Sequence, residues 1–190
     1  NPLKEIDEIK AMFDADKCAL ILIDIQGKLA DVMTDKETTF NNIEKLIKGA
    51  QTLEVPIIWV EQIPEKMGPT IGQLSTHLSD LTPIAKTAFS CFGDDVFKEK
   101  LSSLGVNQTI LVGIESHVCV YQTAADLVAA KYEVQVVADA VSSRTADNRQ
   151  IGINRMRSLG AEIASTEMIL FELLRKSDNP KFRDIARLIK

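Results

Sequence analysis

The chain alternates short apolar runs with longer segments in which apolar residues return every three or four positions. An apolar run that is bounded by polar residues and is too short for a helix is typical of a buried parallel strand. Runs of this kind predict strands at residues 19–25, 56–61, 84–86, 109–114, 134–138 and 161–164, of which 84–86 is the shortest.

The segments between these runs have apolar residues at helical spacing, which is typical of amphipathic helices. They predict helices at residues 43–53, 94–104, 119–130, 148–159, 167–175 and 182–189. Gly105 and Gly160 follow two of them, and glycine is a common helix end. The last segment has apolar residues on one face, so we expect it to pack against its own domain or against a partner subunit.

This order of elements predicts an α/β fold: a three-layer α/β/α sandwich with a central parallel, Rossmann-like sheet of five to six strands. We interpret residues 1–190 as a single domain. Right-handed crossovers place the carboxyl ends of all strands at one edge, and ligands bind there, where the strand order reverses. The residues that directly follow the strands are therefore the first candidates for chemistry.

One connection, residues 62–83, is long and rich in proline and glycine. A connection of this length in a compact domain is usually functional or mobile. Two interpretations stay open: a lid over the site, or a surface excursion with a short helix near residues 71–78.

The charge of the chain excludes several classes of partner. It has 22 Lys and Arg against 27 Asp and Glu, a net charge of −5, and no basic tract. Nucleic-acid binding depends on neutralising phosphates, so we expect no nucleic-acid partner. Its apolar runs are far shorter than the about 20 residues that span a bilayer, so we expect no membrane partner.

The three cysteines, Cys18, Cys91 and Cys119, are an odd number without close pairs. This pattern argues against a disulfide framework and favours a reducing compartment, the cytoplasm.

Several familiar sites are missing from the sequence. It contains no GxGxxG, no GxxxxGK[ST] and no GxSxG, and its two histidines, His77 and His117, are far apart. Dinucleotide, Walker-type phosphate and serine-hydrolase sites are thereby disfavoured, and a metal site is weakly supported. We therefore expect neither a cofactor nor a metal.

Three polar residues remain at the predicted edge: Asp24, Lys86 and Cys119. Each has an ordinary explanation, as a helix cap, a solvated lysine or a small buried side chain. If the first and fourth strands are neighbours, however, Asp24 and Cys119 meet. A thiol at a helix start beside a lysine is expected to have a lowered pKa and to act as a nucleophile, with the carboxylate as proton acceptor.

The other two cysteines differ in whether they could reach the predicted site. Cys18 precedes its strand and is expected at the opposite edge of the sheet. Cys91 follows Lys86 by five residues, so it is the serious rival to Cys119.

Four motifs resemble those of isochorismatase-like cysteine hydrolases. They are LIDIQ at 22–26, KTAFS at 86–90, GIESHVCV at 113–120 and DAVSS at 139–143. The resemblance runs from about Lys17 to the end of the chain. It implies that Asp24 is the general base, Lys86 the third member of a triad and Cys119 the nucleophile. It further implies a cis peptide bond between Ile114 and Glu115, with the backbone amides of Glu115 and Cys119 binding the oxyanion.

The sequence departs from one branch of this family. Nicotinamidases have a metal motif, Asp-x-His with a later His, where this chain has Glu61-Gln62-Ile63. Metal and nicotinamidase activity are therefore not expected. Residues 61–64, 68–70 and 179–182 resemble instead the isochorismatase-domain-containing proteins that mostly lack an assigned substrate.

Five nearby residues are candidates for substrate binding: Gln26, Gln62, Phe89, Phe92 and Ser116. Each has a structural alternative. The glutamines could cap helices, the phenylalanines could pack in the core, and the serine could bond to the backbone of the turn that contains the cis peptide.

The leading hypothesis is a metal-independent hydrolase that forms a covalent intermediate on Cys119. Its substrate is a small molecule with an amide, carbonyl or vinyl-ether group. The resemblance also implies a homo-oligomer, a dimer or tetramer. Two alternatives stay open: a catalytically silent binding protein on the same fold, and a thiol redox sensor in which Cys91 resolves Cys119, which requires Cα atoms within about 7 Å.

Overall fold

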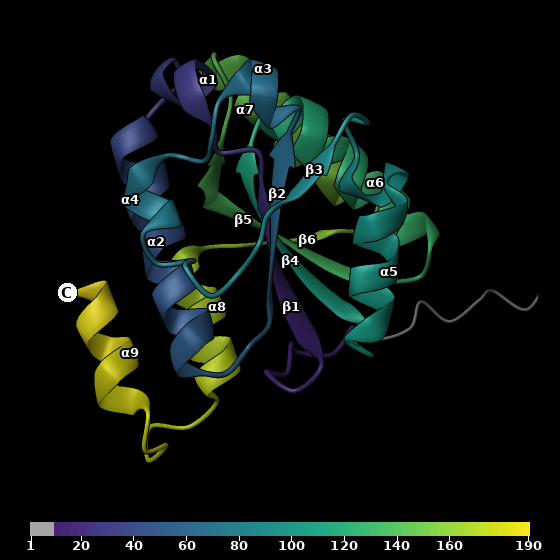
Figure 1. The fold of residues 1–190 in the computed structure, drawn as a ribbon. Coiled ribbons are helices and arrows are strands. Elements are labelled where there is room, and N and C mark those ends of the chain that lie inside the picture. Colours follow the sequence, from purple (N-terminus) through teal and green to yellow (C-terminus); the bar gives the residue numbers. More distant parts are fainter. Residues whose placement is uncertain (1–9) are drawn as a thin grey trace, which may run out of the picture.

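The computed structural model describes residues 10–190, so residues 1–9 of the predicted domain 1–190 lie outside the described part. Six strands form one parallel sheet in the order β3-β2-β1-β4-β5-β6 (Figure 1). The three-layer α/β prediction is confirmed. The strands are β1 (Cys18–Ile23), β2 (Ile57–Gln62), β3 (Ile84–Lys86), β4 (Gln108–Ile114), β5 (Glu133–Ser142) and β6 (Glu162–Ala164).

Helices cover both faces of the sheet, with α2, α8 and α9 on one side and α5, α6 and α7 on the other (Figure 1). The long helices are α2 (Lys36–Thr52), α5 (Asp95–Ser103), α6 (Tyr121–Ala129), α7 (Ala146–Ser158), α8 (Thr166–Leu174) and α9 (Phe182–Ile189). The short ones are α1 (Gly27–Asp31), α3 (Pro64–Met67) and α4 (Gly72–Ser75), with a 3₁₀ turn η1 (Cys91–Gly93) and a π-helical turn η2 (Ser116–Val120).

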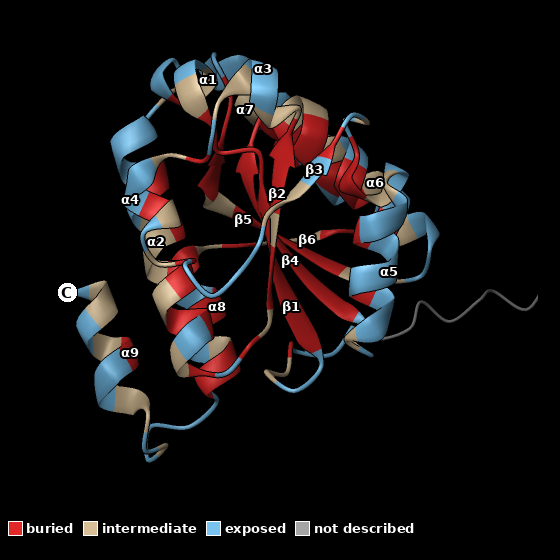
Figure 2. Cartoon of the chain, in the orientation of Figure 1, coloured by how far each residue is buried: buried red, intermediate tan, exposed pale blue. Residues whose placement is uncertain are grey.

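The four central strands, β2, β1, β4 and β5, are mostly buried and red in Figure 2, whereas the edge strands β3 and β6 are more exposed. In β1, Leu20 and Leu22 pack under α2 and α8, whereas Ile21 and Ile23 pack under α5, α6 and α7. Since successive strand residues point to opposite faces, a sheet covered on both sides needs apolar residues at every position. This is the reason for the unbroken apolar run in the sequence.

β5 continues to Ser142, four residues past the predicted strand at 134–138. Its pairing with β4 shifts register between Leu111 and Gly113. At Gly113, with φ of 125°, a Cβ would lie 2.1 Å from the Ile23 carbonyl oxygen. Only glycine therefore permits this close approach of β4 to β1, directly before the turn that contains Cys119.

The last helix packs on its own chain. Ile185 is fully buried, and Phe182, Leu188 and Ile189 pack against the core that α2 and α8 line. Of the two expectations for this helix, the structure shows the intramolecular one.

The segment 62–83 is tied to the domain along its length. Gln26 Nε2 donates to the Gly68 carbonyl at 2.8 Å. Thr70 donates from its N–H and hydroxyl to Glu61 Oε2 at 2.6 and 2.7 Å. Gln51 Nε2 donates to the His77 carbonyl at 2.7 Å. These bonds favour a structured surface excursion, and α4 lies within the short helix expected near 71–78.

The short helices α1 and α3 are in direct backbone contact, with no side chain between them. At Gly27, with φ of 46°, a Cβ would lie 2.2 Å from the Met67 carbonyl oxygen, and Gly68 lies on the other side of the same contact. α1 and α3 therefore cross as a pair above the carboxyl edge of the sheet (Figure 1). Within residues 10–190, no helix is long and apolar enough to cross a membrane.

Candidate active site

Three strand ends place the predicted triad at the carboxyl edge. Asp24 follows β1, Lys86 ends β3 and Cys119 lies in η2, directly after β4. β1 and β4 are neighbours at the centre of the sheet, where the strand order reverses. This is the condition that the sequence hypothesis required. Asp24 and Cys119 line one cavity of about 260 Å³, and Lys86 lies behind Asp24.

Asp24 is buried, and its two carboxylate oxygens differ. Oδ2 accepts a hydrogen bond from Lys86 Nζ at 2.9 Å. Oδ1 is buried and has no hydrogen-bond donor among residues 10–190. The backbone at Asp24 has φ of 56°, a left-handed conformation, and its N–H donates to the Val60 carbonyl at 3.2 Å. One oxygen is thus fixed to a cation, while the other is an unused acceptor on the cavity wall.

Lys86 is fully buried rather than solvated. Its Nζ donates to Asp24 Oδ2 and Gln62 Oε1, and to the carbonyls of Ala88 at 3.0 Å and Phe89 at 2.8 Å. An ammonium group has three protons, so four acceptors saturate it. Lys86 is therefore a fixed positive charge with no proton left to donate to a ligand.

The Cys119 thiol is nearly buried in a turn with an unusual hydrogen-bond pattern. The Glu115 carbonyl accepts the N–H groups of Val118 and Val120, the residues on either side of Cys119. The side chain lies on the cavity wall with Asp24. The turn thus presents the sulfur to the cavity from the end of the central strand β4.

The expectation of a lowered thiol pKa is wrong for this arrangement. Burial raises the pKa of Cys119, the Asp24 carboxylate raises it further, and the Lys86 ammonium opposes both. The physical reason is that the thiol lies in a mostly apolar cavity and the lysine charge is already compensated by Asp24. Cys119 therefore rests as a neutral thiol.

Burial also raises the pKa of the Asp24 carboxyl, against the opposing effects of the Lys86 charge and the Cys119 thiol. A carboxylate with a raised pKa binds a proton more readily than an exposed one does. Asp24 is thus a stronger base than an ordinary surface aspartate.

The turn before Cys119 contains a cis peptide bond between Ile114 and Glu115, at the position that the resemblance implies. The Glu115 side chain is buried and accepts from the Arg144 backbone N–H at 2.9 Å and from Arg144 Nε at 3.1 Å. Ile114, Glu115 and Cys119 all line the cavity.

Two of the five substrate-binding candidates line this cavity. Gln62 holds its amide in place by donating from Nε2 to the Thr87 carbonyl at 2.8 Å. Phe89 lies at the cavity with 54% of its surface exposed.

The structure places Gln26, Phe92 and Ser116 outside the cavity wall. Gln26 joins β1 to β2, because its amide pairs with the N–H and carbonyl of Gln62 at 2.6 and 3.0 Å. The Phe92 ring packs edge-on against Tyr132. Ser116 Oγ donates to the Arg149 carbonyl at 2.9 Å. Phe92 thus packs as its structural alternative predicted, whereas Gln26 links two strands and makes no helix-cap bond, and Ser116 bonds to the backbone of α7 instead of the turn around the cis peptide.

Several lining residues were not predicted. They come from α1, from α3 with the residue before it, and from the strand and turn around Cys119: Leu29, Ile63, Lys66, Met67, Ile114 and Val118. α1 and α3 have five and four residues, which is too short for an apolar period to identify them.

The other cysteines are not part of the cavity wall. Cys18 begins β1 at the opposite edge, as expected, and Cys91 is fully buried in the core beneath α5 and α6. Burial raises the pKa of each to about 12. Cys18, Cys91 and Cys119 are all free thiols.

Glu61, which stands where nicotinamidases have their metal motif, forms structural hydrogen bonds in this chain. Glu61 is buried and accepts both hydrogen bonds from Thr70, which leaves its carboxylate engaged. In the described part of the chain, no three His, Cys, Asp or Glu side chains are grouped so that they could hold a metal ion.

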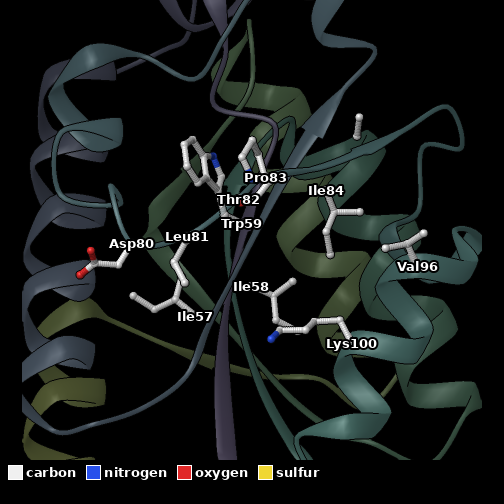
Figure 3. Close-up of a pocket in the computed structure, with 11 residues that line it drawn as sticks. Ile57, Ile58, Trp59, Asp80, Leu81, Thr82, Pro83, Ile84, Val96 and Lys100 are labelled. Carbon is white, nitrogen blue, oxygen red and sulfur yellow. The ribbon is translucent and has the colours of Figure 1, made fainter.

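A second, larger cavity of about 550 Å³ lies beside β2, β3 and α5 (Figure 3). Its wall includes Trp59, Leu81, Val96 and Lys100, and it contains none of the triad residues. Trp59 is half-buried here and donates from Nε1 to Thr70 Oγ1 at 2.8 Å.

Comparison with known proteins extends these observations. The family model described as the isochorismatase domain matches residues 18–168. Isochorismatase domain-containing protein 2 of Xenopus laevis is 35% identical over 170 residues, covering 90% of this chain and 82% of that protein. The secreted isochorismatase effector Isc1 of Phytophthora sojae (strain P6497) is 33% identical over 175 residues, covering 90% and 83%.

Solved structures agree with the fold. A structure described as MAR1 ribonuclease from Caenorhabditis elegans has a TM-score of 0.88 and 36% identity, covering 94% of this chain and 92% of that chain. The YcaC gene product from Escherichia coli, described as an octameric hydrolase of unknown specificity, has a TM-score of 0.89 and 23% identity, covering 95% and 90%.

Proposed function

Since this chain belongs to the isochorismatase family of hydrolases, we propose that it is a metal-independent cysteine hydrolase with Cys119 as nucleophile and Asp24 as base. One observation supports this above the others. Asp24 has a buried oxygen, Oδ1, to which no N–H or O–H group of residues 10–190 donates, beside the Cys119 thiol on the cavity wall, while its second oxygen is fixed by Lys86. A structural ion pair has no need of a free acceptor beside a thiol.

The first half of the reaction forms a covalent intermediate. The Cys119 sulfur attacks the electrophilic carbon of the substrate, and the thiol proton passes to Asp24 Oδ1. A carbon–sulfur bond forms, and the carbonyl electron pair moves to oxygen. With an amide or ester substrate, the bond from this carbon to the leaving nitrogen or oxygen breaks as the tetrahedral species collapses, Asp24 returns the proton to the leaving atom, and a thioester remains on Cys119.

The second half restores the enzyme. A water molecule attacks the thioester carbon and gives a proton to Asp24. The carbon–sulfur bond breaks, the sulfur takes the proton back, and the acid product leaves. Because the thiol rests neutral and the raised pKa of Asp24 favours proton uptake, transfer accompanies the attack.

Lys86 acts by position in this scheme. With four acceptors around its ammonium, it keeps Asp24 Oδ2 in place and favours the ionised carboxylate. The oxyanion is assigned to the backbone amides of Glu115 and Cys119, which support such a role because both residues line the cavity.

The size of the cavity limits the substrate. At about 260 Å³ it is smaller than the roughly 300–1,000 Å³ typical of drug-sized ligands, and its wall is mostly apolar. A small amide, carbonyl or vinyl-ether compound fits these dimensions. An RNA strand, which the name of the C. elegans structure suggests for that protein, is larger than the cavity and is disfavoured by the net charge of −5.

The test is turnover of a panel of small amides, ureas, esters and vinyl ethers, with intact-mass detection of an adduct. We expect the wild type to hydrolyse at least one member and to form an adduct on Cys119, and Cys119→Ala to lose both. Cys91→Ala, which removes a buried thiol outside the cavity, is the matched control and should keep turnover. Full activity of Cys119→Ala would overturn the proposal, and a wild type without turnover or adduct would favour the silent binding protein.

Assembly and location are also part of the proposal. The octamer described for the YcaC neighbour supports a homo-oligomer but is larger than the expected dimer or tetramer, and light scattering coupled to size exclusion measures the number of subunits. The cytoplasm is supported by three free thiols, whereas the P. sojae relative is named as secreted. Cell fractionation decides between the two locations.

A further inference from the structure

The cavity wall has three charged residues, and two of them are neutralised. Asp24 is paired with Lys86 at 2.9 Å, and Glu115 is paired with Arg144 at 3.1 Å. The third is Lys66, in the last turn of α3. Among residues 10–190, no carboxylate forms a salt bridge with Lys66 and no acceptor binds its Nζ. The unbalanced charge of the cavity is therefore positive and lies on α3, although the chain as a whole is acidic.

The remaining wall between Lys66 and the reacting groups is apolar. Leu29, Ile63, Met67 and Val118 supply most of this surface. An uncharged compound would bury itself against these side chains but would gain nothing from the lysine. A compound with an anionic group at one end would use both features, because charge complementarity raises the local concentration and orients the ligand.

We propose that the substrate is a small apolar carbonyl compound with an anionic group, such as a carboxylate, that Lys66 binds while the carbonyl carbon meets Cys119. This inference rests on the proposed function, since it assigns Cys119 as the nucleophile. Lys66 determines specificity and takes no part in bond making.

The experiment uses two alkylating probes of nearly equal size, the anion iodoacetate and the neutral iodoacetamide. The Cys119 sulfur attacks the carbon of either probe while its proton passes to Asp24, the carbon–iodine bond breaks and iodide leaves, so no natural substrate is needed. The measured quantity is the ratio of the two rate constants at Cys119, read by peptide mass spectrometry and compared with the same ratio for a free cysteine peptide. An exposed lysine at the cavity wall, with no carboxylate paired to it, should raise this ratio by about three- to tenfold at low salt.

Lys66→Met keeps the apolar stem and should return the ratio to that of the peptide, with the iodoacetamide rate within about twofold of wild type. Lys66→Glu should lower the ratio further. Lys28→Met is the matched control, since Lys28 is exposed on the neighbouring α1 and does not line the cavity. The wild-type ratio should also fall as salt is added, because exposed charges are screened over about 10 Å at 0.1 M.

The possible failures are distinguishable. If Cys119 is not modified by either probe, the proposed function is overturned. If Cys119 is modified but its ratio equals that of the peptide or is unchanged in Lys66→Met, the anionic substrate is overturned and the hydrolase proposal stands. An equal fall in both rates in Lys66→Met would also overturn it, because a neutral probe does not sense the charge.

Discussion

Of the two cavities beside β2, the larger has none of the triad residues in its wall and the smaller has a buried carboxylate and a thiol. The larger, about 550 Å³, lies along the amino half of β2, where β3 is too short to pair with it. The smaller, about 260 Å³, lies at the carboxyl edge and contains a buried carboxylate, a thiol and a cation behind them. The larger cavity is open because the edge strand β3 is short. The smaller one contains the polar groups because it lies where the strand order reverses.

Forming the smaller cavity also costs more folding free energy than forming the larger one. Removing Asp24 and Lys86 from water costs several kcal/mol per ion before their attraction is counted, and apolar residues of similar size often fold at least as well. The larger cavity has no buried ion pair in its wall. Buried charge retained at a strand edge is a stronger indication of function than empty space.

The largest expected effect is that of Asp24→Asn, which keeps the shape of the side chain and removes the proposed base. Turnover should fall by about 10²–10⁴-fold. Because the Asp24 carboxylate raises the pKa of Cys119 while Lys86 lowers it, the variant thiol should titrate at a lower pH than the wild-type thiol. The pH dependence of iodoacetamide alkylation measures this. An upward or absent shift would contradict the assigned interaction, and Asp80→Asn, at the larger cavity, should change neither quantity.

Lys86→Met should lower the free energy of unfolding by about 3 kcal/mol at pH 8, because it leaves the Asp24 charge buried and unpaired. The variant has a still higher Asp24 pKa in the folded state than in the unfolded state. The folded state therefore loses stability as pH rises through that value, and the deficit should be smaller at pH 5. Urea unfolding at both pH values provides the test. Lys100→Met, at the larger cavity, is the control, and an equal loss in the two variants would remove the distinction between the cavities.

A smaller effect is expected at Glu44, which binds Gln73 and His77 of the segment 62–83. Gln73, Lys48 and His77 hold the pKa of Glu44 at about 2, below its usual 4.5. A lowered pKa stabilises the fold above about pH 4.5 and loses that effect as the pH falls towards 2. With solvent screening, Glu44→Gln should lose about 1 kcal/mol at pH 7.

The same variant should also have a flatter stability profile between pH 5 and 2. Chemical denaturation across that range measures it, with Glu37→Gln, an exposed change on α2, as the comparison. A profile as steep as that of the wild type would assign the acid sensitivity to other carboxylates.

The smallest effect is expected at the wall of the larger cavity. Val96 has 61% of its surface exposed, so Val96→Ser should change stability by no more than about 0.5 kcal/mol and leave turnover unchanged. A large loss of turnover in this variant would place function at the larger cavity.

The positions of the triad were predictable because each residue follows an apolar run. Strand ends in a parallel sheet share one edge, so Asp24, Lys86 and Cys119 could be placed together from the sequence. The thiol pKa could not be predicted in the same way, because burial and the prior pairing of Lys86 depend on residues far apart in the chain. Phe89 and Phe92 also shared one sequence pattern, but Phe92 lies within the 3₁₀ turn Cys91–Gly93 and packs against Tyr132, whereas Phe89 precedes that turn and lines the cavity.

The backbone contact at Gly27 has a consequence for how specificity can change over evolution. It joins α1 and α3 into one lip that contributes Leu29, Lys66 and Met67 to the cavity and contains none of the triad residues. A lineage can replace these side chains, and so exchange one substrate for another, while the strands keep the reacting groups in place. Relatives that keep Asp24, Lys86 and Cys119 at these strand ends are therefore expected to differ in substrate before they differ in the type of reaction.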